Sequence, residues 1–296
     1  MNPIEVAFPS NNIKISAHLY VPKANSDEKF PALVVLHPGG GVKEQTAGLY
    51  ARKLAENGYV TLAFDRRYQG ESEGTPRNLE DPFASIEDTK SAMTYLACHD
   101  KVDADRIGIL GVCAGGGYAI FAASTDPRVK AIGTVSMVCI GALFTAIPEE
   151  SLTGLIVQAG EARAEYAKTG QVKYLPFVPS QDQLSADSSV LMREGSEYYL
   201  TSRGSHPRSV NKFALWSYDI IPAYDSFAKI ERLSPRPLLL VAGKDADTIG
   251  HSHMAFWKAK EPKELHTIEG ATHIDLYDKK VDEVAVKLTE FYKRHL

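Results

Sequence analysis

The sequence predicts an α/β protein built on a mostly parallel sheet with helices on both faces. Three observations lead to this fold class. Short, continuously apolar runs such as residues 32–36 are typical of strands buried in a parallel sheet. Segments with apolar residues at helical spacing alternate with these runs. The alternation stops once, over residues 145–232, a stretch that is too long for an ordinary loop.

Local signals fix the elements in order along the chain. Residues 6–8 and 13–20 alternate around a polar turn, which predicts an antiparallel pair. Asn57-Gly58 is a typical end of a first helix, and Asp81 is a typical cap at the start of a second. The other expected strands are residues 32–36, 59–64, 106–112, 129–138, 237–242 and 264–268, and the expected helices include residues 46–57, 82–98 and 281–296.

The interruption of the pattern suggests a division of the chain. We interpret residues 145–232 as a largely helical cap inserted between two strands of the sheet. Residues 1–144 and 233–296 would then form the core. Aromatic residues of the cap could line a pocket or pack inside the cap, and the second alternative is favoured: Tyr174, Phe177, Tyr198, Tyr199 and Trp216.

Composition narrows the class of protein. The 296 residues carry a formal net charge of -4 and a pI near 6.2, which gives no support for binding nucleic acid or an anionic membrane surface. No apolar run reaches the ~18 residues that span a bilayer, and no signal peptide is visible. Cys98, Cys113 and Cys139 form no C-x-x-C pair, which argues against a disulfide framework or a cysteine zinc site. A cytoplasmic protein without a cofactor is expected.

The most informative motif is Gly111-Val112-Cys113-Ala114-Gly115, between a predicted strand and a run of small residues. This arrangement predicts a nucleophile elbow, a sharp turn that exposes its central side chain above a sheet. A cysteine at the N-terminus of a helix is expected to have a lowered pKa and to be a competent nucleophile. The alternative is a buried cysteine in a glycine-rich turn.

A second motif, His37-Pro38-Gly39-Gly40-Gly41, directly follows a predicted buried strand. Backbone N–H groups near Gly39 and Gly40 could stabilise an oxyanion together with the N–H of Ala114. The alternatives are a flexible loop or a phosphate cradle, but the Gly-Lys-Ser/Thr signature of a phosphate loop is missing.

The general base is expected at His273, in a loop after the last short strand; a solvated loop histidine is the alternative. The acid that orients its ring should follow the preceding strand. Asp245 and Asp247 compete, because the usual spacing falls on Ala246 between them. Asp247 is slightly favoured, but both aspartates could be ordinary loop carboxylates. An acidic thiol also tolerates a weak third member of the catalytic triad. His251 and His253 lack a third ligand at metal-site spacing, so no metal is expected.

With these motifs in order, the chain resembles the α/β-hydrolase superfamily, and more closely its dienelactone-hydrolase-like branch with a cysteine nucleophile. The resemblance is strongest over residues 37–48, 68–72, 111–118 and 270–277. It implies an α/β-hydrolase fold, Cys113 as nucleophile, His273 as base, and Gly39, Gly40 and Ala114 as the oxyanion region. One position departs from the pattern, since Cys139 stands where an aspartate is expected, and this leaves Asp245 or Asp247 as the acid.

The expected function is hydrolysis of an activated carboxylic ester, thioester or lactone through a cysteinyl acyl-enzyme. The expected partner is a small-molecule acyl substrate, with no nucleic acid and no membrane, and a homodimer is compatible with the sequence. The alternatives are an acyltransferase on the same scaffold and a non-catalytic small-molecule receptor. The extended cap prevents the substrate of dienelactone hydrolases from being carried over.

Overall fold

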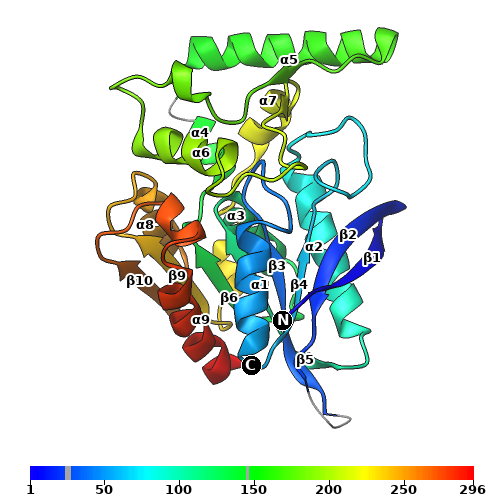
Figure 1. The fold of residues 1–296 in the computed structure, drawn as a ribbon, viewed down its shortest axis with the longest axis vertical. Helices are drawn as coiled ribbons and strands as arrows, with labels where there is room; N and C mark the ends of the chain where they lie inside the picture. The colour runs from blue at the N-terminus through cyan, green and yellow to red at the C-terminus, as the bar shows by residue number, and fades with distance from the viewer. Residues whose placement is uncertain (24–27, 145–146) are drawn as a thin grey trace.

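The computed structural model of the chain describes residues 1–23, 28–144 and 147–296, and it has the predicted α/β architecture (Figure 1). A sheet of eight strands has the order β1-β2-β4-β3-β5-β6-β9-β10. β1 pairs antiparallel with β2, and β2 with β4, whereas the other neighbours are parallel. The strands are β1 (Ile4–Ser10), β2 (Ile13–Tyr20), β3 (Phe30–Leu36), β4 (Val60–Phe64), β5 (Val102–Val112), β6 (Val129–Val135), β9 (Leu238–Gly243) and β10 (Lys263–Ile268).

Helices cover both faces of this sheet, so alternate residues of a central strand enter two different cores. Leu33 and Val35 of β3 pack in the core under α1 (Thr46–Glu56) and α9 (Val281–His295). Val34 and Leu36 pack in the core on the opposite face, which involves α2 (Pro82–Ala97), α3 (Ala114–Ser124) and α8 (Ile249–Lys258). The continuous apolar runs of the sequence are explained by burial on both sides.

The elements differ from the predicted ones in two places near the carboxyl ends of the strands. β6 ends at Val135 rather than at residue 138, because Ser136 adopts a left-handed φ of 45° and turns the chain. The Ser136 hydroxyl then donates a hydrogen bond of 3.0 Å to the carbonyl of His273. The helix α8 was not predicted.

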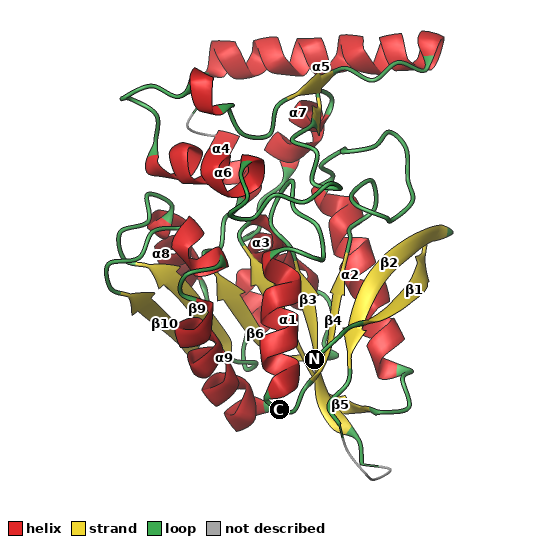
Figure 2. Cartoon of the chain, viewed as in Figure 1, coloured by secondary structure: helices red, strands yellow, loops and turns green. Residues whose placement is uncertain are grey.

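The chain between β6 and β9 lies across the carboxyl edge of the sheet (Figure 2). It contains α4 (Ile140–Phe144), α5 (Glu149–Thr169), α6 (Val190–Leu200), α7 (Ser217–Ile220) and a small antiparallel pair, β7 (Tyr174–Leu175) with β8 (Phe213–Ala214). The long α5 runs along the outer side of this layer (Figure 1). We refer to residues 147–232 as the cap.

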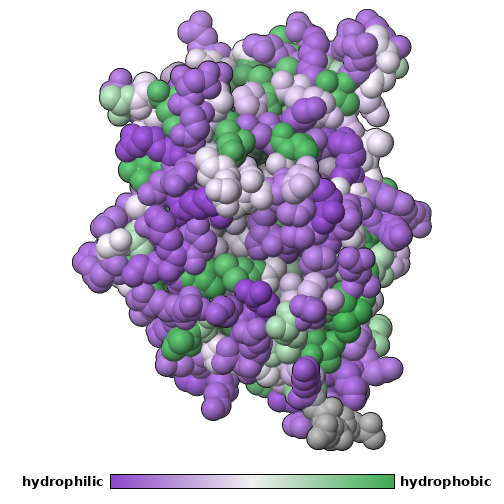
Figure 3. All heavy atoms as spheres, viewed as in Figure 1, coloured by the Kyte–Doolittle hydropathy of each residue, from purple (hydrophilic) through white to green (hydrophobic). Residues whose placement is uncertain are grey.

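The surface carries no continuous apolar face in the view of Figure 3, where hydrophobic residues form separate small patches among hydrophilic ones. Within the described ranges, every helix is too short or too polar to cross a bilayer.

Candidate active site

Cys113 occupies the tip of the turn from β5 to α3, with a φ of 54° and a ψ of -121°. A non-glycine residue adopts such a positive φ only at a cost in backbone strain, as is usual at a nucleophile elbow. The two glycines of the motif are required sterically. A Cβ atom on Gly111 would lie 2.2 Å from the carbonyl oxygen of Gly115, and one on Gly115 would lie 2.8 Å from the carbonyl oxygen of His37.

The Cys113 thiol lies on the wall of a cavity, and hydrogen bonding from the backbone N–H groups of Gly39 and Ala114 and interaction with the Tyr277 hydroxyl act to lower its pKa. The predicted lowering of its pKa is wrong in direction. Burial raises the pKa of the Cys113 thiol, and the three hydrogen bonds oppose this effect only in part. The Cys113 side chain is therefore a neutral thiol at pH 7.

The N–H of Gly39 is aimed at the thiol because the other side of its peptide group is fixed. The Pro38 carbonyl oxygen lies 2.7 Å from Nδ1 of His37 and accepts a hydrogen bond of 3.1 Å from Nη2 of Arg66. In a trans peptide the carbonyl and the following N–H point in opposite directions. His37 and Arg66 thus hold the Gly39 N–H toward Cys113 from behind.

Arg66 is itself fully buried and paired. Its guanidinium forms an ion pair with Glu80 and lies 4.9 Å from the centroid of the Tyr118 ring. Glu80 also accepts a hydrogen bond of 2.6 Å from the Tyr118 hydroxyl, and Tyr118 belongs to α3. The network connects the glycine-rich loop to the helix that follows Cys113.

The cap holds the same loop from the front. The Tyr199 hydroxyl donates a hydrogen bond of 3.2 Å to the Gly39 carbonyl, and the Ser209 hydroxyl donates one of 2.7 Å to the Gly40 carbonyl. The ring of Phe177 covers both glycines, since a Cβ atom on Gly40 would lie 2.7 Å from it. Glycine is needed here for space and for the φ of 65° at Gly40.

A cavity of about 250 Å³ lies between the core and the cap, with Cys113, Gly39 and Ala114 on its wall. Side chains from α4 and α6, such as Phe144 and Leu191, provide much of the remaining lining. Among the described residues, the lining contains no charged side chain. Such a cavity suits an uncharged, apolar group bound next to the thiol.

Two of the cap aromatics expected to pack inside the cap contribute to this cavity: Phe177 and Tyr199. The other three do pack away from it. Tyr174 and Trp216 lie in or against a separate small core of the cap, and Tyr198 belongs to the core shared with α1 and α9.

His273 lies in the loop before a short 3-10 helix, η4 (Ile274–Tyr277), and is almost completely buried. Its Nδ1 lies 2.6 Å from the Thr248 hydroxyl, and its Nε2 lies 3.1 Å from the Tyr277 hydroxyl. Burial, with a contribution from nearby His251, lowers the pKa of His273 to about 3. The ring is therefore neutral at pH 7 and can accept a proton on Nε2 when Nδ1 carries the hydrogen.

The expected contact between His273 and an aspartate is not what the structure has, because Thr248 takes that place. Asp247 is exposed, and its carboxylate accepts a hydrogen bond of 2.9 Å from the backbone N–H of Leu191 in the cap. Asp245 is also exposed, and its backbone N–H binds the carbonyl of Ala271. The position of usual spacing, Ala246, is buried but offers no acceptor side chain.

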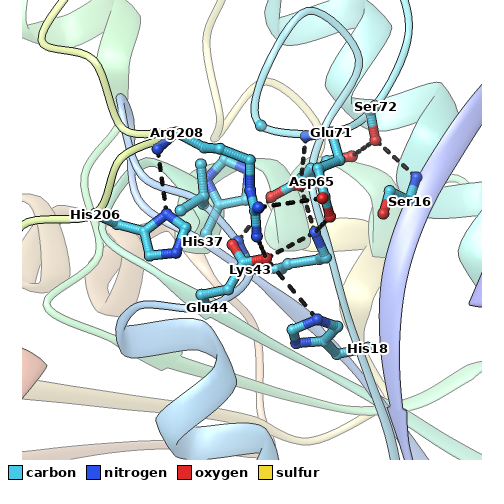
Figure 4. Close-up of polar contacts among 12 residues, drawn as sticks. Ser16, His18, His37, Lys43, Glu44, Asp65, Glu71, Ser72, His206 and Arg208 are labelled. Atoms are coloured by element: carbon cyan, nitrogen blue, oxygen red, sulfur yellow. Dashed lines mark hydrogen bonds and ion pairs between the residues drawn. The ribbon is translucent and has the colours of Figure 1, made fainter. Parts of the chain in front are cut away.

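A cluster of charged residues lies beside the glycine-rich loop (Figure 4). The carboxylates of Glu44, Asp65 and Glu71 come within 4.8 Å of one another, a grouping that could hold a metal ion. Nζ of Lys43 lies 2.8, 2.9 and 2.6 Å from these three groups, so its single positive charge already pairs with all three carboxylates. Arg208 of the cap pairs with Glu44 and Glu71, which makes the cluster a connection between core and cap.

The other cysteine and histidines discussed in the sequence analysis do not line the cavity. Cys139 is buried, and its sulfur accepts a hydrogen bond of 3.3 Å from the backbone N–H of Ser226. His251 is half-buried and His253 is exposed on α8. The sequence reasoning missed Thr248 and Tyr277. The position of Tyr277, one helical turn after His273, is a signal that could have found it.

These features define a member of a large enzyme fold family. Residues 31–280 match the alpha/beta hydrolase fold family, and the chain belongs to it. The chain is 40% identical to the uncharacterized protein YcjY of Escherichia coli K12 over 99% of both chains. It is 30% identical to the thiohydrolase aneE of Aspergillus aculeatus, over 91% of this chain and 86% of that protein. The crystal structure of hypothetical protein PA2218 from Pseudomonas aeruginosa has a TM-score of 0.93 and 35% identity, covering 99% of this chain and 94% of that one.

Proposed function

We propose that this protein is a hydrolase of the dienelactone-hydrolase-like type, which cleaves an activated ester, thioester or lactone of an apolar acyl group through a cysteinyl acyl-enzyme. One observation carries the proposal. The Cys113 thiol lies on the wall of an uncharged cavity, and the N–H groups of Gly39 and Ala114 point to it. A reducing, cytoplasmic environment and a cap of residues 145–232 belong to the same proposal.

The proposed reaction has two halves. Sγ of Cys113 attacks the acyl carbonyl while the thiol proton passes to His273, and the oxyanion is stabilised by the N–H groups of Gly39 and Ala114, typically worth ~3 kcal/mol per donor. The leaving group takes the proton and departs, which leaves a thioester. Water, activated by His273, then releases the acid. A thiolate is itself a good leaving group, so activated esters and thioesters suit this mechanism better than amides.

The acyl-enzyme provides the direct test. The protein is mixed with p-nitrophenyl octanoate, the reaction is quenched in acid, and the mass of the protein and of its peptides is determined by mass spectrometry. We expect the added mass of one octanoyl group on the peptide that contains Cys113. Cys113→Ala should lose this adduct and at least about 10⁴-fold in turnover, whereas Cys98→Ala, at an exposed thiol away from the cavity, should retain both. Binding of the ester without acylation or turnover would favour the receptor alternative.

Acyl transfer remains the second candidate, and the apolar lining favours it because such a cavity excludes water. The two reactions are separated by the fate of the acyl-enzyme. Addition of an alcohol or a thiol as acceptor would divert the octanoyl group to a new ester or thioester in a transferase. In a hydrolase, octanoic acid would remain the main product.

The apolar cavity also predicts chain-length selectivity. Gly195 of α6 lines the cavity, and a Cβ atom there would meet only Val178 at 3.4 Å, so a larger side chain would extend into the space of the acyl chain. Gly195→Leu is expected to lower kcat/KM for p-nitrophenyl octanoate by about 10- to 100-fold relative to p-nitrophenyl acetate. Gly160→Leu, on the exposed face of α5, is the matched control. An unchanged octanoate-to-acetate ratio in Gly195→Leu would contradict this location of the acyl chain.

A further inference from the structure

The nucleophile and the base of the proposed mechanism do not lie on the same side of the cavity wall. Cys113 and Tyr277 both line the cavity. His273 is almost completely buried and has no place in the lining. The ring of Tyr277 packs against His273, with ring centroids 5.4 Å apart, and of these two residues only Tyr277 lines the cavity.

One hydroxyl connects the two residues. Oη of Tyr277 lies 3.1 Å from Nε2 of His273, and the same hydroxyl forms a hydrogen bond with the Cys113 thiol. A phenol oxygen can accept one proton while it donates another, which is the requirement for a relay. The order along the chain of contacts is therefore thiol, phenol, imidazole and Thr248 hydroxyl.

The backbone around this hydroxyl is fixed. The Tyr50 hydroxyl donates a hydrogen bond of 2.6 Å to the carbonyl of Leu276, next to Tyr277, and Ser136 donates to the carbonyl of His273. The Tyr277 ring also packs edge-on against Tyr198, with centroids 5.2 Å apart. With the neighbouring backbone fixed by two hydrogen bonds and the ring packed against Tyr198, the Tyr277 hydroxyl keeps its place beside the imidazole.

We propose that Tyr277 is a catalytic residue that carries the proton from Cys113 to His273. As Sγ forms its bond to the acyl carbonyl, the S–H bond breaks and the proton moves to Oη of Tyr277. The O–H bond of Tyr277 breaks in the same event, and that proton forms the N–H bond at Nε2 of His273. The electron pair of the carbonyl moves to the oxygen bound by Gly39 and Ala114. Tyr277 is unchanged, and it returns the proton to the leaving group by the reverse path.

This inference rests on the proposed function, and Tyr277→Phe tests it. The variant keeps the packing ring and removes only the oxygen that joins thiol and imidazole. We expect acylation of Cys113 by p-nitrophenyl octanoate to slow by about 10²- to 10⁴-fold, with KM nearly unchanged because the cavity keeps its shape. Tyr292→Phe is the matched control, since it removes another buried tyrosine hydroxyl, 2.6 Å from the Ile109 carbonyl and remote from the cavity.

A proton inventory separates a relay from a structural role. Acylation rates of the unaltered protein are measured in mixtures of water and heavy water, and two protons in flight should give a curved dependence on the deuterium fraction. A linear dependence, or acylation of Tyr277→Phe at or above the unaltered rate, would overturn the relay. Absence of any acyl adduct on Cys113 in the unaltered protein would instead overturn the proposed function itself.

Discussion

Replacement of His273 by glutamine is expected to lower kcat/KM by about two to four orders of magnitude and, at the same time, to make the protein more resistant to acid. The loss of activity follows from the loss of the general base. Glutamine is close in size to histidine, and its amide can still bond to the Thr248 hydroxyl, which lies 2.6 Å from Nδ1. The variant is therefore expected to fold.

The expected resistance of His273→Gln to acid follows from the pKa of His273. Burial lowers this pKa to about 3, against 6.5 in an unfolded chain. Below pH 6.5 the unfolded chain binds a proton at this residue and the folded protein does not. The free energy of unfolding then falls as the pH drops from 6.5 toward 3, by at most about 1.4 kcal/mol per pH unit for one group. Stability is fully retained above pH 6.5, and the loss below it is absent in His273→Gln.

Urea unfolding at several pH values between 4 and 7 measures the effect. The unaltered protein and His253→Gln, a change at an exposed histidine, should lose stability in parallel as the pH falls. His273→Gln should lose less stability, because its unfolding takes up close to one proton fewer. His37 is buried with a strongly lowered pKa and contributes equally to all three proteins. Equal pH slopes in the unaltered protein and His273→Gln would show that the imidazole is not buried in its neutral form.

Arg66→Met is expected to destabilise the protein by about 3–5 kcal/mol, because it leaves the carboxylate of Glu80 buried without its partner. The double variant Arg66→Met, Glu80→Gln should recover most of this loss. It removes both charges, and the amide oxygen can still accept the hydrogen bond from Tyr118. Denaturant titration of the single and double variants measures the difference.

Activity should respond differently from stability in this pair. Neither variant can hold the Pro38 carbonyl through Nη2 of residue 66, so the Gly39 N–H is less well aimed at the oxyanion in both. We expect kcat to fall between about 10- and 100-fold in the single and the double variant alike. Arg67→Met is the control, since Arg67 pairs with buried Asp88 and has no contact with the loop. It should lose stability and retain kcat; full kcat in the double variant would contradict the positioning role of Arg66.

The sequence was sufficient for the sheet, the elbow and the glycine-rich loop for a physical reason. Strands buried on both faces are apolar without interruption, and a turn as tight as that at Cys113 excludes side chains at Gly111 and Gly115. Such constraints remain visible in a single sequence. The end of β6 was harder to predict from the sequence, because the left-handed turn at Ser136 contains no glycine.

The surroundings of His273 were predicted less well, because several side chains can bond to an imidazole. Two aspartates in the expected loop were better candidates by residue type than Thr248, but it is the Thr248 hydroxyl that contacts Nδ1 of His273. The lowered pKa expected for Cys113 followed from its place at a helix end, but burial, which depends on the whole fold, has the larger effect. Tyr277 was part of a recognised segment, but only the folded chain shows its hydroxyl between sulfur and imidazole.

The double support of the glycine-rich loop has a consequence for engineering and for evolution. The carbonyl groups of Gly39 and Gly40 are oriented by Tyr199 and Ser209, which belong to the cap. A cap transplanted from a relative would change the specificity pocket, but it would also remove these two donors. A functional chimera must therefore transfer hydroxyls to both positions along with the new cap. Under the proposed function, a change of cap therefore alters the substrate pocket and the support of the oxyanion-binding loop at the same time.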